Sequence, residues 1–400
     1  MKFGLIRERK NPPDRRVVLS PEACRQLLDE FKELEIIVEP SPIRVFTDQE
    51  YRDQGVEVSD RMAECDVLLG VKEVPIEALI PNKKYFFFSH TIKKQPYNRD
   101  LLRAVLEKNI ELFDHEVITN AKGQRLVAFG RYAGIVGAYN GIRAWGMRHK
   151  TFDLPKAEHL KDQADLIAHL KTADMGQAKI VLTGKGRVGN GAREMLVGMQ
   201  MREVDTEAFL SQDFEEAVFC QIDVLDYNTP KDGSKGSRKE FFANPEVYKS
   251  TFMPFAETAN LFIAGHFHND AAPFLYTRED VRSEGFNLSV VADISCDIDG
   301  PVATTLQAST IADPLYGYDP LKEAVVDWQE KDSITVMAVD NLPCELPRDA
   351  SEGFGKAFGS EVIPAFFNGD ARGVLERACM TRGGNLTPLF TYLSDYVAGE

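Results

Sequence analysis

A glycine-rich turn is the clearest chemical signal in the sequence. The residues from Gly184 to Gly189 read Gly-Lys-Gly-Arg-Val-Gly, which is the spacing GxGxxG, and they follow a predicted strand at 179–183. Between a strand and a helix, this spacing lets Gly184 form a tight turn, Gly186 admit a pyrophosphate and Gly189 pack closely. The turn therefore predicts a dinucleotide bound at a helix N-terminus, where backbone N–H groups and the helix dipole favour phosphate. A glycine turn without a ligand is the alternative.

An acidic residue about 20 residues after such a turn commonly binds the adenosine ribose. Asp205 lies 21 residues after the first glycine of the turn, at the end of a predicted strand at 201–205. Its carboxylate would accept the ribose hydroxyls of NAD and repel the additional phosphate of NADP, although Glu203 competes for this role. Lys185 and Arg187 could instead serve a phosphate. We therefore expect NAD as the cofactor, with NADP as the alternative.

Titratable residues follow two predicted strands of the N-terminal third. Lys72 and Glu73 come directly after a strand at 67–71, and His90 comes after a strand at 85–89. Open α/β sheets bind ligands at the carboxyl ends of their strands, so these side chains could face one site. Lys72 and His90 could then form an acid–base pair that transfers protons near neutral pH. An exposed lysine and a hydrogen-bonded histidine are the simpler interpretation of these two residues alone.

Other polar residues have weaker claims on chemistry. Arg16 follows a turn and could clamp a substrate carboxylate, although an arginine on the surface is the simpler explanation. Asp293 and Asp297 close a predicted strand at 288–292, at the carboxyl end of the nucleotide sheet, where they could reach a nicotinamide, although solvated acids at a strand end are common. His266 and His268 alternate as on one face of a strand, but no further ligands accompany them. We therefore expect no metal site.

Composition and charge exclude several classes of function. The 62 acidic residues outnumber the 47 Lys and Arg residues and give a net charge of −15, which argues against nucleic acid and anionic membranes as main partners. No apolar run approaches the roughly 20 residues of a membrane-spanning helix. The six scattered cysteines have no zinc-like spacing, and without a secretory start they predict a reducing cytoplasm. We expect small-molecule substrates and a monomer or small homo-oligomer.

The predicted elements alternate in a pattern typical of parallel sheets covered by helices. Continuous apolar strands and amphipathic helices fill the N-terminal third. A second such series begins with the predicted strand at 179–183, which precedes the glycine-rich turn. A long helix is expected at 132–148, where three glycines cost stability unless close packing requires them. We therefore expect an α/β protein of two Rossmann-like domains, the first discontinuous, with a cleft between them. The expected boundaries are 1–133 with 342–400 for the substrate domain and 134–341 for the dinucleotide-binding domain.

Several blocks of sequence resemble one known family. Arg16-Val17-Val18-Leu19-Ser20-Pro21 is similar to the start of the alanine dehydrogenase and transhydrogenase superfamily. Three further blocks more specifically resemble saccharopine dehydrogenase (lysine-forming) and the lysine–2-oxoglutarate reductase half of the bifunctional enzyme. They are Val71-Lys72-Glu73-Val74-Pro75, Phe88 to Gln95 and Val127 to Gly134. The resemblance continues through Asp340-Asn341-Leu342-Pro343. It is colinear over nearly the whole chain.

This resemblance implies an enzyme of lysine metabolism that transfers a hydride reversibly between NAD and saccharopine, giving lysine and 2-oxoglutarate. It implies that the catalytic residues are Lys72, His90 and Asp297. It implies that the substrate-side residues, which bind substrate carboxylates or modulate the catalytic pair, are Arg16, Lys93, Glu73 and Glu116. The expected cofactor-binding residues are Gly184, Gly186, Arg187, Val188, Gly189, Asp205, Asn341 and Leu342.

The chain also departs from that family's pattern. The segment 232–248 looks inserted relative to shorter members, and residues 265–270 replace a more aromatic stretch. A second, glutamate-forming half is not expected. Two alternatives stay open: an alanine dehydrogenase-like enzyme with a smaller substrate, and a non-catalytic nucleotide-binding subunit. The second has no use for Lys72, His90 and Asp297 together.

Overall fold

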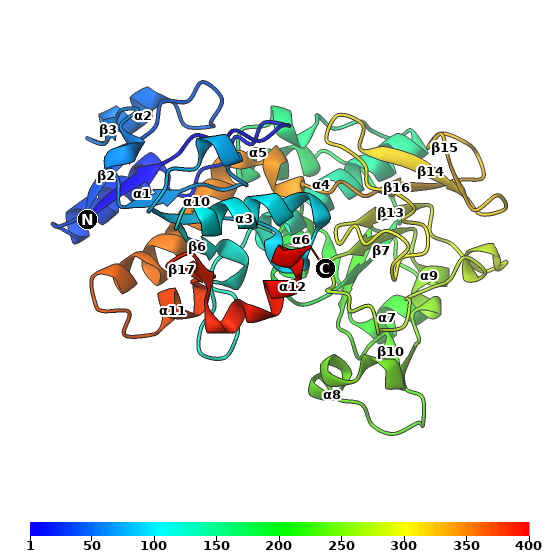
Figure 1. The fold of residues 1–400 in the computed structure, drawn as a ribbon. Helices are drawn as coiled ribbons and strands as arrows, with labels where there is room; N and C mark the ends of the chain where they lie inside the picture. Colours follow the sequence, from blue (N-terminus) through cyan, green and yellow to red (C-terminus); the bar gives the residue numbers. More distant parts are fainter. Residues whose placement is uncertain (400) are drawn as a thin grey trace. The chain divides into compact units, whose positions relative to one another are not determined.

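The computed structural model describes residues 1–399 of the chain, which form two compact units (Figure 1). Unit 1 comprises Met1–Phe129 together with the chain from Pro347 onward, and unit 2 comprises Gly130–Leu346. The boundaries expected from the sequence differ from these by four and five residues. Each unit contains a sheet of mainly parallel strands, so the α/β class expected from the sequence is confirmed.

Unit 1 is built on a six-stranded sheet in which every pair of neighbours is parallel, in the order β3-β2-β1-β4-β5-β6. Its strands are β1 (Lys2–Leu5), β2 (Glu35–Val38), β3 (Glu57–Val58), β4 (Val67–Leu69), β5 (Lys84–Phe87) and β6 (Glu111–Asp114). Its helices are α1 (Pro21–Glu30), α2 (Asp48–Asp53), α3 (Arg99–Glu107), α10 (Pro347–Glu361), α11 (Val374–Ala378) and α12 (Ser394–Ala398). The short strands β17 (Thr381–Arg382) and β18 (Asn385–Leu386) complete the unit.

The C-terminal segment packs against the N-terminal strands and helices of unit 1, as the blue and orange ribbons of Figure 1 show. The Ser351 hydroxyl of α10 accepts the Val17 N–H at 2.9 Å. In the core, the Phe358 ring of α10 meets the Phe86 ring of β5 edge-on, with centroids 5.5 Å apart. Phe354 stacks on Phe129 at 4.5 Å. This unit is therefore discontinuous in sequence because its aromatic core is completed from both ends of the chain.

Unit 2 is built on an eight-stranded sheet in the order β15-β14-β16-β13-β12-β7-β9-β8, in which β14 alone runs against its two neighbours. Its strands are β7 (Lys179–Thr183), β8 (Arg202–Glu203), β9 (Val218–Ile222), β12 (Leu261–Ala264), β13 (Val290–Asp293), β14 (Leu315–Asp319), β15 (Ala324–Val326) and β16 (Ile334–Met337). Its helices are α4 (Gly130–His149), α5 (Gln163–Leu170), α6 (Arg187–Gly198), α7 (Thr206–Ser211), α8 (Arg238–Ala243) and α9 (Met253–Thr258). A separate hairpin joins β10 (Asn228–Pro230) to β11 (Tyr248–Ser250).

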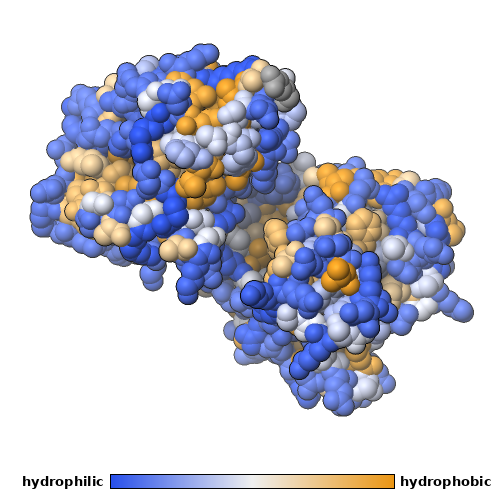
Figure 2. Space-filling model, turned by 60° about the horizontal axis from the view of Figure 1, so that its bottom comes forward, coloured by the Kyte–Doolittle hydropathy of each residue, from blue (hydrophilic) through white to orange (hydrophobic). Residues whose placement is uncertain are grey.

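None of the helices in residues 1–399 is both long and apolar enough to cross a membrane. On the face drawn in Figure 2, hydrophilic residues dominate and hydrophobic residues lie in separate patches.

Close packing explains the glycines of the long helix α4. A Cβ at Gly134 would lie 1.9 Å from the Val188 carbonyl oxygen of α6, and one at Gly191 of α6 would lie 2.1 Å from the Arg131 carbonyl oxygen. The two helices therefore touch through their backbones. Further along α4, a Cβ at Gly141 would lie 2.7 Å from the Ala292 side chain. The packing that the sequence required of these glycines is present, and it fixes α6, the helix that begins at the glycine-rich turn.

Gly134→Ala is expected to lower the free energy of unfolding by about 1–3 kcal/mol, because the added methyl group meets backbone that cannot rotate away. Urea denaturation measures this change. Gly130→Ala in the same helix is the matched control, since its Cβ would lie 3.4 Å from the nearest side-chain atom, an ordinary contact. Equal stability of the two variants would contradict the backbone contact between α4 and α6.

Candidate active site

The sheet of unit 1 brings together the titratable residues that follow β4 and β5. These strands are direct neighbours, with Leu68 opposite Tyr85, and the Phe88 N–H donates to the Val71 carbonyl at 3.0 Å just beyond them. Lys72, Glu73 and His90 follow at the same edge. The sequence expectation that these three residues share one edge of the sheet follows directly from this parallel register.

His90 is held by a carboxylate. Its Nδ1 lies 2.5 Å from Oε1 of Glu73, whose other oxygen accepts from the Lys10 ammonium at 2.8 Å. Burial alone would raise the pKa of Glu73, but the hydrogen bonds from His90 and Lys10 outweigh it and lower this pKa to about 2. Glu73 is therefore ionised at neutral pH. In the neutral imidazole, Nδ1 then carries the proton donated to Glu73, and Nε2 is the nitrogen that can accept one.

The backbone at His90 is also unusual. Its φ of 53° lies in the left-handed region. This backbone conformation is unfavourable for a residue with a side chain, so contacts with the surroundings must hold it there. The ring stacks on Phe88 with centroids 6.4 Å apart, and the side chain stays 22% exposed. Phe88 and Glu73 thus fix the orientation of an imidazole that solvent can still reach.

Lys72 is positioned through Glu8, which the sequence reasoning missed. The Glu8 carboxylate follows β1 and accepts the Val71 and Lys72 N–H groups at 2.7 and 2.9 Å. Desolvation raises the pKa of Glu8 to about 8. The rule that ligands gather at strand ends could have found Glu8 and Lys10, because β1 lies beside β4 in the sheet.

Arg16 lies in a buried ion pair. Its Nε and Nη2 donate to the two oxygens of Asp14 at 3.0 and 2.6 Å, and both residues are 3% exposed. The guanidinium also lies 4.2 Å from the centroid of the Phe129 ring. Burial would raise the pKa of Asp14, but the Arg16 charge and hydrogen bonds, with a smaller contribution from Lys72, lower it to about 2. Lys72 is therefore close enough to this pair to affect it electrostatically.

Lys93 and Glu116 form a looser pair on the same side of the sheet. Lys93 lies on the 3-10 turn after His90, is 59% exposed, and approaches Glu116 Oε1 at 3.9 Å. Glu116 follows β6, and its Oε2 is buried without a hydrogen-bond partner among residues 1–399. A buried carboxylate oxygen of this kind usually has a reason, such as a ligand or an ordered water.

The glycine-rich turn of unit 2 has the geometry that a dinucleotide requires. Gly184 has a φ of +90°, and a Cβ there would lie 2.6 Å from the Gly265 carbonyl oxygen. A Cβ at Gly189 would lie 1.9 Å from the Gly184 carbonyl oxygen, whereas nothing lies within 4 Å of one at Gly186. Helix α6 begins at Arg187, directly after this open position. The first and last glycines therefore pack the turn, and the middle one leaves room for a pyrophosphate at the helix N-terminus.

A pocket of about 390 Å³ opens beside this turn. Residues from the ends of several strands line it, namely Gly184, Lys185, Gly186, Arg187, Val188, Asp223, His266, His268 and Asp297. The structure thus brings Asp297 to the same pocket as the turn. His266 is 8% exposed, its Nδ1 lies 2.7 Å from the Thr183 hydroxyl, and burial lowers its pKa to about 3, so it is neutral.

Asp205 does not line this pocket. The strand expected at 201–205 is only Arg202–Glu203, and it lies at the outer edge of the sheet. Asp205 caps helix α7 and accepts the Ala208 N–H at 2.8 Å, and Glu203 pairs with Arg193 at 2.6 Å. In this structure the Asp205 carboxylate therefore stabilises the first turn of α7.

Asp223, unlike Asp205, directly follows the strand that lies beside the turn's own strand. Strand β9, not β8, lies beside β7, with Thr183 opposite Ile222. The Gly184 N–H donates to the Ile222 carbonyl at 2.9 Å, which ties the turn to the end of β9. Asp223 is the next residue and lines the pocket. The sequence contained a signal for Asp223, because apolar residues precede it and ligand-binding residues often follow such strands.

The last two expected cofactor residues lie elsewhere. Leu342 is 1% exposed, and its side chain packs 3.3 Å from where a Cβ at Gly137 would be. Asn341 precedes the short 3-10 helix Leu342–Glu345, and its carbonyl accepts the Cys344 N–H at 3.0 Å. Neither residue is among those that line the pocket beside the turn.

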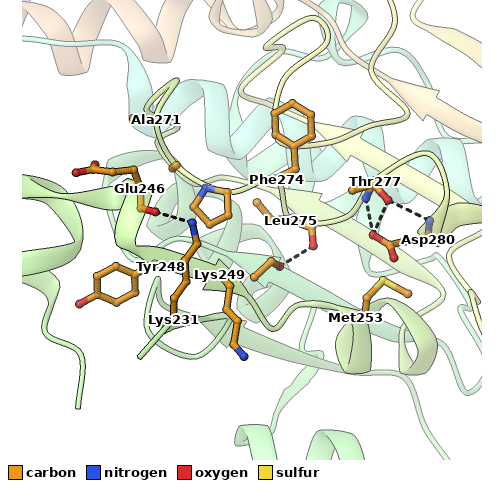
Figure 3. A pocket seen from close by; sticks show the side chains of 13 residues that line it. Lys231, Glu246, Tyr248, Lys249, Met253, Ala271, Phe274, Leu275, Thr277 and Asp280 are labelled. Atoms are coloured by element: carbon orange, nitrogen blue, oxygen red, sulfur yellow. Dashed lines mark hydrogen bonds between the residues drawn. The ribbon is translucent and has the colours of Figure 1, made fainter. Parts of the chain in front are cut away.

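A second pocket of unit 2, about 580 Å³, contains none of the expected site residues (Figure 3). It lies between the β10–β11 hairpin and the segment 271–280, and its wall includes Lys231, Lys249 and Phe274. Lys231 donates to the Glu246 carbonyl at 2.8 Å, so this cation is used by the hairpin itself. Among residues 1–399, no group of three or more His, Cys, Asp or Glu residues is arranged to hold a metal ion.

Two family models match the chain. Residues 4–136 match the model of the alanine dehydrogenase/PNT N-terminal domain, and residues 157–382 match that of the alanine dehydrogenase/PNT C-terminal domain. The chain belongs to the alanine dehydrogenase/PNT family. This result confirms the superfamily that the sequence blocks resemble.

Two groups of curated relatives match most of the chain. The alpha-aminoadipic semialdehyde synthase of Arabidopsis thaliana is 28% identical over 98% of the chain, but the match covers 41% of that protein. The saccharopine dehydrogenase [NAD(+), L-lysine-forming] of Yarrowia lipolytica is 26% identical, covering 88% of the chain and 89% of that enzyme. The chain thus spans less than half the length of the first of these relatives.

Two solved structures share the fold. An L-alanine dehydrogenase is 17% identical and covers 99% of the chain with a TM-score of 0.68, while all of the solved chain is matched. A transhydrogenase from Sinorhizobium meliloti is 14% identical, covers 97% of the chain and 100% of its own, and has a TM-score of 0.58. These likenesses show that the chain has the fold of both proteins.

Glu73→Gln is expected to lower the free energy of unfolding at neutral pH, because the carboxamide loses the charge that His90 and Lys10 stabilise. The pKa of about 2 lies below the ordinary value for glutamate, about 4.3. The stabilisation is therefore complete above about pH 4.3 and is lost as the pH falls toward 2. Urea denaturation at about pH 7, 5 and 3 should show a difference from wild type that is constant at first and then shrinks.

The exposed Glu77→Gln, in the segment that follows Glu73, is the matched control because it removes one carboxylate without breaking this chain of hydrogen bonds. A difference between wild type and Glu73→Gln that does not change between about pH 5 and 3 would contradict the ionised pair.

Proposed function

We propose that the chain is an NAD(H)-dependent oxidoreductase that reversibly converts saccharopine and water into lysine and 2-oxoglutarate. The observation that carries the proposal is the hydrogen-bonded series Lys10–Glu73–His90 beside Lys72, at the carboxyl ends of adjacent parallel strands. Unit 2 of the same chain supplies a glycine-rich turn fitted to a dinucleotide. Relatives that carry the name saccharopine dehydrogenase match along most of the chain.

The proposed reaction needs two groups that move protons. When bound, NAD would supply the hydride acceptor for the carbon that carries the secondary amine of the substrate. The substrate then passes through an imine and a carbinolamine on its way to an amine and an oxo acid, and each step gains or loses a proton. Groups with different protonation equilibria suit such a sequence.

His90 and Lys72 are proposed to carry these protons. Glu73 holds the Nδ1 proton of His90, so Nε2 accepts a proton from the substrate or water and returns it later. Lys72 has its backbone fixed by Glu8 and its ammonium within the electrostatic reach of Asp14 and Arg16. It supplies the second proton-transfer group. Lys10 keeps Glu73 anionic and so preserves the tautomer of His90.

The substrate carboxylates require cations. Lys93 is exposed and lies 3.9 Å from Oε1 of Glu116, whose other oxygen is buried, and we propose that Lys93 binds one carboxylate while Glu116 orients it. Arg16, which is held in place by its ion pair with Asp14, is proposed to bind another carboxylate in a low-dielectric setting that strengthens charged hydrogen bonds. These few cations form a local positive site on a chain whose net charge is −15.

For the dinucleotide, we propose that the pyrophosphate lies against Gly184, Gly186, Arg187, Val188 and Gly189. We propose Asp223, in place of Asp205, as the carboxylate that accepts the adenosine ribose hydroxyls, because it follows the strand next to the turn. Asp297 lines the same pocket and is proposed for the nicotinamide side. Asn341 and Leu342 keep at most a supporting role in this proposal, since Leu342 is buried in packing.

The reaction is tested by following oxidation of NADH with three mixtures: lysine plus 2-oxoglutarate, pyruvate plus ammonium, and 2-oxoglutarate plus ammonium. Oxidation with lysine plus 2-oxoglutarate is expected, and its product should be saccharopine by mass spectrometry. Activity with pyruvate plus ammonium instead would show an alanine dehydrogenase-like enzyme and sink the proposal. Tight NADH binding without oxidation in any mixture would favour a nucleotide-binding subunit.

Lys72→Met and His90→Ala are each expected to reduce turnover by at least about 100-fold, the usual contribution of a proton-transfer group. The binding of NADH is expected to stay near that of wild type, because both residues lie in unit 1 and the turn lies in unit 2. Steady-state kinetics and fluorescence titration measure the two effects.

Two exposed residues offer matched controls for these variants: Lys122→Met removes a lysine and His159→Ala a histidine. Both controls should keep wild-type turnover. If Lys72→Met and His90→Ala also keep it, the two proposed roles are wrong.

A further inference from the structure

Helix α8 places two side chains at the dinucleotide pocket from a segment that lies between the strands of the β10–β11 hairpin. One face of α8 is anchored: Phe241 is 5% exposed and its ring meets that of Tyr248 at 5.1 Å. Tyr248 is 1% exposed and donates from its hydroxyl to Glu240 at 3.1 Å. The Ser237 hydroxyl caps the helix by accepting the Glu240 N–H at 3.2 Å. This short helix is therefore fixed to the body of unit 2.

The side of α8 that carries Arg238 and Phe242 lines the pocket. Arg238 and Phe242 are four residues apart, which places them on one side of a helix, and both are pocket residues. Arg238 Nη1 lies 2.8 Å from Oδ2 of Asp223, and the Arg238 side chain is 55% exposed. Oδ1 of Asp223 accepts the Val224 N–H at 2.8 Å. Phe242 is 48% exposed, which leaves an aromatic face open to a ligand.

The ion pair changes what Asp223 can recognise. A lone carboxylate beside the adenosine ribose favours a hydroxyl at the 2′ position and repels a phosphate there, whereas a neighbouring arginine accommodates that phosphate. Here one pocket carries both groups, in contact. Arg238 neutralises the carboxylate when the ligand has a 2′-hydroxyl, and its exposed guanidinium offers a planar set of donors for a phosphate.

We propose that Arg238 is the binding residue for the 2′-phosphate of NADP(H), so that this site accepts both NAD(H) and NADP(H). The proposal rests on the proposed function, because it takes the pocket beside Gly184 as the dinucleotide site. Phe242 contacts the adenine ring of either dinucleotide and does not distinguish them. Asp223 contacts the 2′-hydroxyl of NAD(H) and gives up its partner Arg238 when the phosphate is present.

The proposal is tested on the full chain by titrating NADH and NADPH, and the fragments AMP and 2′,5′-ADP, which differ by the 2′-phosphate. Arg238→Ala is expected to weaken NADPH and 2′,5′-ADP by at least about 10-fold, the scale of one hydrogen bond to a charged group. NADH and AMP should change by less than about 3-fold. Phe242→Ala should weaken NADH and NADPH by similar factors.

Lys239→Ala is the matched control, because it removes a positive charge from the same helix but does not line the pocket. It should leave all four affinities unchanged, and Arg238→Lys should retain part of the preference for the phosphate. Circular dichroism melting shows whether each variant is folded.

Each outcome decides between the two proposals. If wild type binds NADH but not NADPH, or if Arg238→Ala weakens both dinucleotides equally or neither, then Arg238 is not the 2′-phosphate residue and the dinucleotide site stands. If wild type binds neither NADH nor NADPH, then the proposed function fails together with this inference.

Discussion

The parallel hydrogen-bond ladder of the two sheets is the constraint on which the candidate site depends. Parallel strands all end at one edge, so residues that are far apart in sequence but directly follow strands become neighbours. In unit 1 this edge gathers Lys72 and Glu73 after β4 and His90 after β5. In unit 2 it gathers the glycine-rich turn after β7 and Asp223 after β9. The chemistry thus depends on strand order more than on any single residue.

Burial then gives similar side chains different electrostatic roles. Glu8 and Glu73 lie near Lys72, yet desolvation raises the pKa of Glu8 to about 8 while hydrogen bonds from His90 and Lys10 lower that of Glu73 to about 2. The difference arises because Glu8 is satisfied by backbone N–H groups and Glu73 by charged side chains. A carboxylate that is paired with cations stays ionised and can orient an imidazole. A buried carboxyl group that accepts only from backbone amides is less strongly stabilised in its ionised form.

The dinucleotide turn shows how packing can serve binding. Gly134 and Gly191 let α4 and α6 touch through their backbones, and α6 begins at the open position of Gly186. The helix N-terminus that would face phosphate is therefore anchored from behind by a buried helix. The β10–β11 hairpin adds α8 to the same pocket, and with it a cation paired to Asp223. Support from α4 and pocket contacts from α8 thus come from separate parts of the unit.

Local patterns in the sequence were sufficient for much of the fold. Apolar runs predicted β4, β5, β7 and β13 to within a few residues, and glycine spacing predicted the turn at 184–189. The helix expected at 132–148 is α4, Gly130–His149. These features depend on side-chain periodicity and backbone freedom within a few residues, which a sequence records directly.

Only the tertiary structure decided which residues meet. Counting along the chain pointed to Asp205, but β9 rather than β8 pairs with β7, so Asp223 lies at the pocket and Asp205 caps a helix. The sequence likewise did not predict the ion pair between Arg16 and Asp14 or the burial of Leu342. The physical reason is that strand order and burial arise from contacts between distant segments, and residue spacing carries no record of those contacts.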